Sequence, residues 1–189
     1  MARHVKGTLF VDYVRMLKSR KDIDWSKYLN EEDMKFLDEH ERIMPSSWYP
    51  FDTFERFGLG VLQEIGGGHY ESARMWGRMS TDLLLKVYKN MIESGDPAYS
   101  VQKFDIVRAG FFDFPGVKAE ILSESLLHMT VRFSTDKVIG KAQAYQALGA
   151  VERLLELAGA EKIEHTFHKS VWENDPETLI EMTWETPSK

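Results

Sequence analysis

Histidine is the residue type in this chain best suited to hold a transition metal, because cysteine is absent. The lack of cysteine excludes a thiol nucleophile, a cysteine-based zinc site and an iron–sulfur cluster. His165 and His168 lie in a segment predicted to be a strand, where their spacing places them on opposite faces. His128 meeting one of them across adjacent strands stays open as an alternative. We expect exposed or half-buried sheet histidines and no metal site. The six histidines are His4, His40, His69, His128, His165 and His168.

The other reactive residues form no recognisable catalytic pattern. Gly66-Gly67-Gly68 lacks the preceding strand and the Gly-Lys-Ser/Thr sequence of a phosphate-binding loop, so it is expected to end a helix. No pair among the 30 acidic residues stands out, and Ser46, Ser47 and Ser72 have no nucleophile-elbow sequence around them. We therefore predict no catalytic residue and a protein that is not an enzyme. An enzyme of unrecognised reaction is the alternative.

Aromatic side chains are plentiful, since eleven Phe, seven Tyr and five Trp make up 12% of the chain. Many lie in the front half, where they can form an apolar core, an apolar pocket or a surface patch for a partner. The core is the simplest explanation. For a pocket or patch, the residues expected to bind a ligand or partner are Trp48, Tyr49, Trp76 and Tyr88.

The front half of the chain carries the spacing of helices, with apolar residues repeating at intervals of three and four. Asn30, followed by three acidic residues, is typical of a helix start and predicts a helix through about His40. Glycine-containing turns are expected to end the two helices that follow. The other predicted helices are 7–19, 51–65, 69–93, which is the longest, and 98–110.

The period changes to two after the turn Phe114-Pro115-Gly116, which is typical of strands. Only a short turn around Ser123-Glu124-Ser125 lies between the first two strands, so they are predicted to form an antiparallel hairpin. Asp136 is suited to cap the next helix, which ends at Gly159. A second pair of strands follows this helix. The four predicted strands are about 117–122, 127–134, 162–172 and 179–184.

These elements predict the fold class α+β. A helical N-terminal half, about residues 7–111, is expected to pack on a C-terminal antiparallel hairpin–helix–hairpin (ββαββ) unit, about residues 116–185. The 189 residues are within the range of one domain, and no low-complexity linker divides them, so we predict a single domain over 1–189.

The opening Lys6-Gly7-Thr8-Leu9-Phe10, the helical front half and the closing ββαββ unit together resemble a known superfamily. It contains the haem-nitric-oxide-binding (H-NOX) domains, the 4-vinyl-reductase domain and the bacterial relatives of TRAPP vesicle-tethering subunits. With the stretch from Met44-Pro45 to Trp48-Tyr49-Pro50, the chain looks most like a small family of myxobacteria and other deltaproteobacteria. The resemblance spans about residues 5–185 and implies a TRAPP/H-NOX-like fold more strongly than a function.

The resemblance also implies a test for haem. Its haem-binding members resemble one another in a Tyr-x-Ser-x-Arg motif, placed at the end of the second strand, whose side chains hold the haem propionates. The chain contains Tyr70-Glu71-Ser72-Ala73-Arg74, but at the start of a front-half helix. At the implied position it reads Arg132-Phe133-Ser134-Thr135-Asp136, where an acid would repel a propionate. We therefore predict no cofactor, and a haem-dependent gas sensor is the alternative.

Charge and hydrophobicity limit the partners and the location. The net charge of −6 makes general affinity for nucleic acid or for an anionic membrane unfavourable. No signal peptide is recognisable, and no apolar run approaches the ~20 residues that cross a bilayer, so we expect no membrane insertion and a cytoplasmic location.

Together these observations predict a non-enzymatic cytoplasmic signalling or regulatory module. It is expected to act by protein–protein interaction, with a partner in a signalling system, or by binding a small apolar ligand. Members of the superfamily are mostly sensors, ligand-binding regulators or assembly modules, and commonly dimers. An edge strand with unpaired backbone groups also favours pairing with a second copy, so we predict a homodimer.

Overall fold

The computed structural model of the chain describes residues 2–186, which belong to two compact units. The first unit comprises Met1–His69 and Ala109–Phe114, and the second comprises Tyr70–Arg108 and Pro115–Lys189. Helices of the front half between Tyr70 and Arg108 belong to the same unit as the sheet. Whether the two units behave as a single domain stays a prediction.

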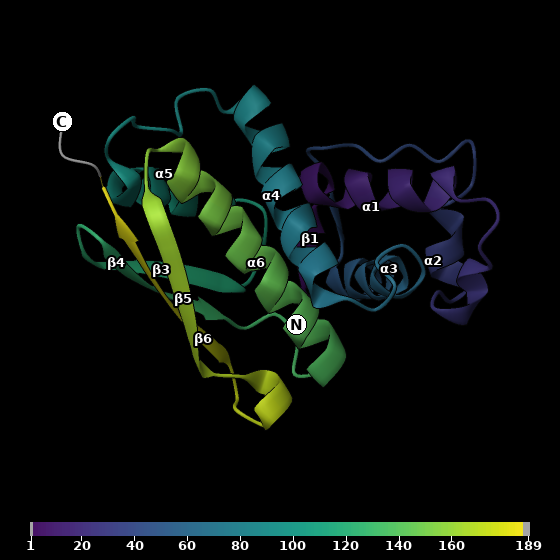
Figure 1. Cartoon of the computed structure of the whole chain (residues 1–189). Helices are drawn as coiled ribbons and strands as arrows, with labels where there is room; N and C mark the ends of the chain where they lie inside the picture. Colours follow the sequence, from purple (N-terminus) through teal and green to yellow (C-terminus); the bar gives the residue numbers. More distant parts are fainter. Residues whose placement is uncertain (1, 187–189) are drawn as a thin grey trace. The chain divides into compact units, whose positions relative to one another are not determined.

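Short helices and a small β-ribbon form the first unit (Figure 1). Its core is aromatic: the ring of Phe10 stacks on Tyr49 at 4.8 Å between centroids and lies 5.2 Å from Phe57. These rings are buried, as a large aromatic core requires. The elements are β1 (His4–Lys6), α1 (Gly7–Ser19), η1 (Trp25–Lys27), α2 (Glu31–Lys35), β2 (Trp48–Pro50) and α3 (Phe51–Glu64), with β1 and β2 antiparallel.

Helix α2 begins as predicted but ends sooner. The side chain of Asn30 accepts a hydrogen bond from the backbone of Asp33, whose side chain accepts one from the backbone of Asn30. After Lys35 the helix ends in tight turns, in which the amide of Phe36 donates to the carbonyl of Asp33 at 3.1 Å. The turns place the Phe36 ring 5.2 Å from that of Phe10, so packing in the core ends the helix before His40.

The second unit contains an antiparallel four-stranded sheet with the strand order β3-β4-β6-β5. The two hairpins are present as predicted, although the last strand lies inside the sheet and not at its edge. Apolar side chains alternate into one face of the central strands, where Leu127, Met129, Ile180 and Met182 are fully buried. The strands are β3 (Val117–Ser123), β4 (Leu126–Val131), β5 (Glu161–Lys169) and β6 (Thr178–Glu185), with the turn η2 (Val171–Glu173) between the last two.

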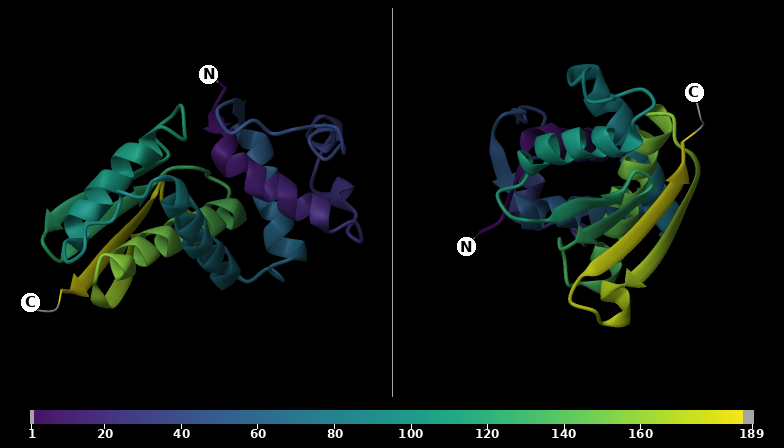
Figure 2. Two further views of the ribbon diagram at one scale, coloured as in Figure 1. Left: turned by 90° about the horizontal axis from the view of Figure 1, so that it is seen from above. Right: turned by 90° about the vertical axis from the view of Figure 1, so that its left-hand side faces the viewer.

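Helix α6 (Lys137–Leu157) lies across one face of this sheet, and α4 (Tyr70–Val87) packs along α6 (Figures 1 and 2). Asp136 caps α6 as predicted, since its carboxylate accepts hydrogen bonds from the amides of Val138 and Ile139. Helix α4 ends at Val87 and not at residue 93, so α6 is the longest helix described. The remaining helix of the unit is α5 (Pro97–Ala109).

The structure confirms the predicted α+β class, with helices and antiparallel sheets in one chain. Among the described residues, every helix is too short or too polar to span a bilayer.

Candidate functional site

The apparent Tyr-x-Ser-x-Arg match at residues 70–74 forms the first turn of α4. Arg74 holds Glu152 of α6 through two hydrogen bonds, of 2.8 Å from Nε and 2.7 Å from Nη2. Glu152 is 3% exposed, so the guanidinium of Arg74 neutralises a buried carboxylate. Arg74 therefore joins two helices of the second unit, and its guanidinium is already engaged.

The position that the resemblance assigns to the motif follows β4. Arg132 donates from Nε to Glu177 at 2.5 Å, and Asp136 accepts the two amides that begin α6. Both charged side chains thus have local partners. An aspartate at the helix N-terminus is also favourable with respect to the helix dipole. Arg132 and Asp136 therefore have structural roles at this position, and the residues present here do not fit haem propionates.

Two of the four predicted binding residues, Trp48 and Tyr49, lie on β2 in the first unit. Tyr49 belongs to the core: its ring stacks on Phe10, and its hydroxyl accepts a hydrogen bond from the amide of Met44 at 2.8 Å. Trp48 is 44% exposed, and the ammonium of Lys6 lies 3.9 Å from its ring centroid. Of this pair, the structure leaves Trp48 accessible to a partner.

The other two predicted residues, Trp76 and Tyr88, belong to the second unit, and both are half-buried. Trp76 lies within α4, and Tyr88 directly follows its last residue. A binding role for the four residues stays a prediction.

Sequence reasoning missed an aromatic cluster around Lys141 in the second unit. The ammonium of Lys141 lies 4.8 Å from the ring centroid of Tyr70 and 5.1 Å from that of Trp172. Tyr145, one helical turn after Lys141, stacks on Phe167 at 5.5 Å. Burial raises the pKa of the Tyr70 hydroxyl, with a smaller contribution from the charge of Asp136. Only the spacing of Lys141 and Tyr145 is visible in the sequence; the other three rings are brought to them by tertiary packing.

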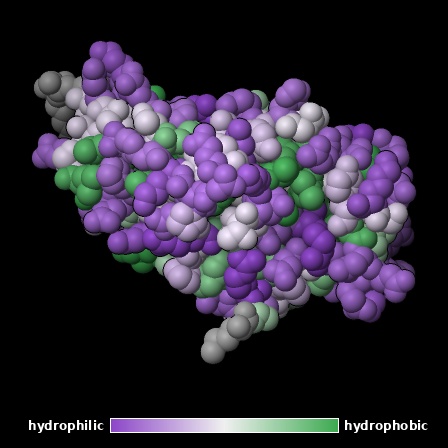
Figure 3. Space-filling view, turned by 90° about the horizontal axis from the view of Figure 1, so that it is seen from below, coloured by the Kyte–Doolittle hydropathy of each residue, from purple (hydrophilic) through white to green (hydrophobic). Residues whose placement is uncertain are grey.

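Helix α4 also carries an apolar stripe that the sequence analysis did not single out. Its four members recur every fourth residue and therefore share one helix face. They are Met75, Met79, Leu83 and Val87, which are 61%, 55%, 42% and 72% exposed. On the face of the molecule shown in Figure 3, hydrophobic residues form small groups scattered among hydrophilic ones.

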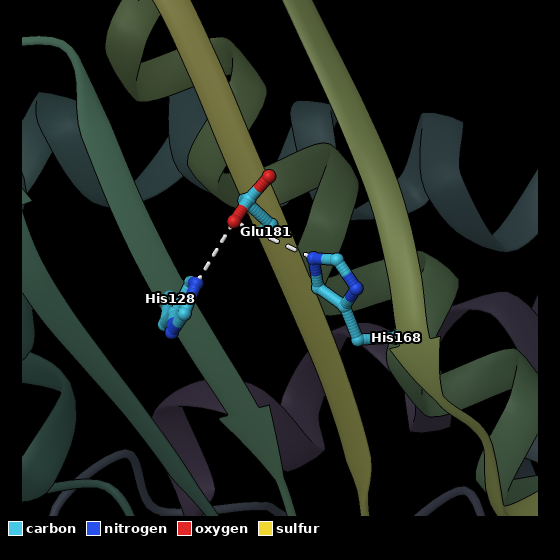
Figure 4. A group of neighbouring side chains, drawn as sticks. All are labelled: His128, His168 and Glu181. Carbon is cyan, nitrogen blue, oxygen red and sulfur yellow. Dashed lines mark hydrogen bonds and ion pairs between the residues drawn. The ribbon is translucent and has the colours of Figure 1, made fainter.

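Three side chains converge on the sheet face that α6 leaves uncovered. Glu181 of β6 lies between two histidines, His128 of β4 and His168 of β5 (Figure 4). Its Oε2 atom is 3.0 Å from Nε2 of His128 and 3.4 Å from Nε2 of His168. The hydrogen bond to His128 is the main cause that lowers the pKa of the Glu181 carboxyl.

The histidine predictions are confirmed in part. His165 and His168 do point to opposite faces: His165 lies 3.7 Å from the buried Glu152, on the side of α6. His128 does approach one of the pair, but not across adjacent strands, because β6 and its Glu181 lie between them. The sequence signal for Glu181 was its alternation with the buried Ile180 and Met182, which places it on the outer face.

Comparisons with known proteins identify the fold. No family model matches the chain, and no curated protein matches it. Solved H-NOX structures do match over nearly the whole chain. An H-NOX protein from S. oneidensis in the Fe(II)NO ligation state has a TM-score of 0.63 at 9% identity, covering 96% of this chain and 99% of that one.

Two further structures agree. A single-residue mutant of T. tengcongensis H-NOX has a TM-score of 0.60 at 15% identity and covers 97% and 100% of the two chains. An Fe(II) unliganded mutant of the H-NOX protein from K. algicida has a TM-score of 0.63 at 12% identity and covers 95% and 96%. The fold is therefore H-NOX-like. The 4-vinyl-reductase, TRAPP and myxobacterial parts of the resemblance stay predictions.

Proposed function

We propose that this chain is a non-enzymatic sensor domain that binds a ligand within an H-NOX-like fold. The observation that carries the proposal is the extent of the structural match, which covers 95–97% of this chain in the three comparisons above. The same matches cover 96–100% of the H-NOX chains, so the likeness extends over the whole sensor fold of those proteins. A cytoplasmic location is part of the same proposal.

The comparisons favour a haem-dependent gas sensor, the alternative from the sequence, over a protein-interaction module as the main function. One matching structure is described as being in an Fe(II)NO state, and the description of another concerns haem distortion in the H-NOX family. We therefore propose haem as the first ligand to test. Haem supplies an iron atom that can bind a diatomic gas.

The chain's own residues restrict how haem could be held. Arg74 is engaged by Glu152, Arg132 by Glu177, and Asp136 caps a helix. The propionate contacts of the Tyr-x-Ser-x-Arg motif are therefore absent at residues 132–136. A haem in this domain would have to be held by other groups, so the proposal rests on the fold and not on the motif.

Titration of the purified chain with haem tests this function. The proposal expects a Soret band that saturates at one haem per chain and shifts when nitric oxide is added. The matched control is the double variant His128→Ala/His168→Ala, because exposed histidines can bind haem at the surface. An absorption spectrum that stays that of unbound haem, or a band that this variant loses, would contradict a haem-dependent sensor.

Protein interaction is the second candidate, and the apolar stripe on α4 favours it. A row of Met, Leu and Val side chains on one helix face is suited to adaptable contact with another protein. Within the sensor proposal, this stripe is a surface through which a partner in a signalling system could respond to ligand binding. A homodimer, formed through this stripe or through an edge of the sheet, is considered below.

A further inference from the structure

We propose that His128, His168 and Glu181 form a binding site for a divalent transition-metal ion, with zinc as the representative ion. The three side chains contribute two imidazole nitrogens and one carboxylate oxygen, and these atoms all lie within 4.8 Å of one another. Two histidines and one carboxylate are a donor set used by zinc sites that keep a coordination position open. Zinc binding at these three residues requires neither haem nor a gas ligand.

The distances from the carboxylate oxygen to the two imidazole nitrogens are close to those around a tetrahedral ion. Zinc binds nitrogen and oxygen at about 2.0–2.1 Å, so neighbouring donors in a tetrahedral site are roughly 3.3–3.5 Å apart. The measured separations from Glu181 Oε2 are 3.0 Å to His128 and 3.4 Å to His168. Small side-chain rotations would bring all three donors to their positions around one ion.

The sheet positions the three side chains without help from a loop. His128 and Glu181 are direct partners in the β4–β6 register, so their side chains project side by side from the same face. His168 lies at an irregularity of the β5–β6 register, between Phe167 and Lys169. The period of two along β5 places His168 on the same face as Glu181, and its imidazole points towards that carboxylate (Figure 4).

The surroundings leave the three groups available to an ion. Among the described residues, the ion-pair partners of Glu181 are the two histidines, with no lysine or arginine in competition. The side chains of His128, His168 and Glu181 are 33%, 44% and 32% exposed, so an ion can enter from solvent. A neutral imidazole coordinates a metal ion through its ring nitrogen. Three protein ligands leave a further coordination position for water or another ligand.

Zinc titration of the metal-free chain, followed by calorimetry and thermal unfolding, tests the site. We expect one zinc ion per chain and a melting temperature that rises with zinc, whereas magnesium and calcium have no effect because they prefer oxygen ligands. Lowering the pH to about 5 should weaken binding, since protons compete for the imidazoles. His128→Ala, His168→Ala and Glu181→Gln should each weaken zinc binding by at least about tenfold.

His165→Ala is the matched control, because His165 comes from the same strand as His168 but faces α6. It should keep wild-type zinc affinity. The absence of saturable zinc binding to the wild type would overturn the proposal, as would a His128→Ala variant with unchanged affinity. If the cluster were only an ion pair, Glu181→Gln would change the melting temperature equally with and without zinc.

Discussion

Asp33 is a buried carboxylate of the first unit with several hydrogen-bond donors around it. It is 1% exposed, and it accepts hydrogen bonds from Thr53 at 2.7 Å and from Arg56 at 2.6 and 2.8 Å. Burial alone would raise the pKa of the Asp33 carboxyl. The hydrogen bonds from Arg56, Thr53 and the Asn30 backbone outweigh burial, so the pKa is lowered. One acidic side chain thus ties the start of α2 to α3.

Replacement of this carboxylate should be costly. Asp33→Asn removes the charge but keeps the shape, and we expect it to lower the free energy of unfolding by about 3 kcal/mol at neutral pH. A carboxyl whose pKa is lowered by folding stabilises above its unfolded pKa of about 3.9 and loses this effect as pH falls through the folded value. The difference between variant and wild type should therefore shrink below pH ~4.

Denaturant unfolding at a series of pH values measures both effects. Glu32→Gln is the matched control, since Glu32 precedes Asp33 but is exposed and pairs with the exposed Lys35. It should change stability by less than about 1 kcal/mol. Equal effects of the two substitutions would contradict the assigned role of Asp33.

At the scale of elements, the contact between α4 and α6 depends on glycine. A Cβ atom added at Gly149 would overlap the carbonyl of Arg74, and one added at Gly77 would overlap the carbonyl of Gln146. Gly149 and Gly77 therefore allow the backbones of these two helices to approach closely. Ion pairs such as Arg74–Glu152 and Arg78–Glu156 bridge the same two helices.

A single methyl group should force these helices apart. We expect Gly149→Ala to destabilise the second unit by about 1–3 kcal/mol, because backbone atoms cannot move aside as a flexible side chain would. Gly60→Ala in α3 is the control, since an added Cβ there meets only Trp25 and Tyr28 at ordinary distances of 3.4–3.5 Å. It should be neutral or stabilising by up to ~1 kcal/mol. Thermal unfolding of both variants measures these changes in stability. A Gly149→Ala variant as stable as wild type would contradict the close contact of the two helix backbones.

At the scale of the whole molecule, the prediction to test is the homodimer. Strands β3 and β5 form the edges of the sheet, and β6 is paired on both sides. Strand β5 carries two register irregularities, which make an edge less suited to pairing. The exposed stripe on α4 offers a second surface for a partner copy. The β5 edge and the α4 stripe are therefore alternative contacts for a dimer, and the irregular edge is the less favourable of the two.

Sedimentation at micromolar concentration measures the assembly. A dimer should have about twice the chain mass of 21.9 kDa. Met79→Lys places a charge in the middle of the α4 stripe, so it should dissociate a dimer formed through that stripe and leave one formed through β5 intact. A species of 21.9 kDa alone in the wild type would contradict the homodimer.

Local signals in the sequence determined most of the elements. Apolar residues recur every three or four positions in the helical half and every second position in the strands, and this change located the sheet. Asp136 and Asn30 marked helix starts that the structure confirms. Helix ends were less predictable, because α2 ends where Phe36 turns into the core and not at a breaker residue. The three-residue strands β1 and β2 were missed, since so short a segment shows no alternation.

Tertiary structure alone decided which distant residues meet. The sequence predicts the strands that carry His128 and Glu181. It does not predict that β6 lies between β4 and β5, because strand order depends on how the hairpins pair. It likewise could not reveal that Arg74 is held by Glu152, 78 residues away. Periodicity along the chain specifies which face a side chain occupies, whereas its partner across that face is set by long-range packing.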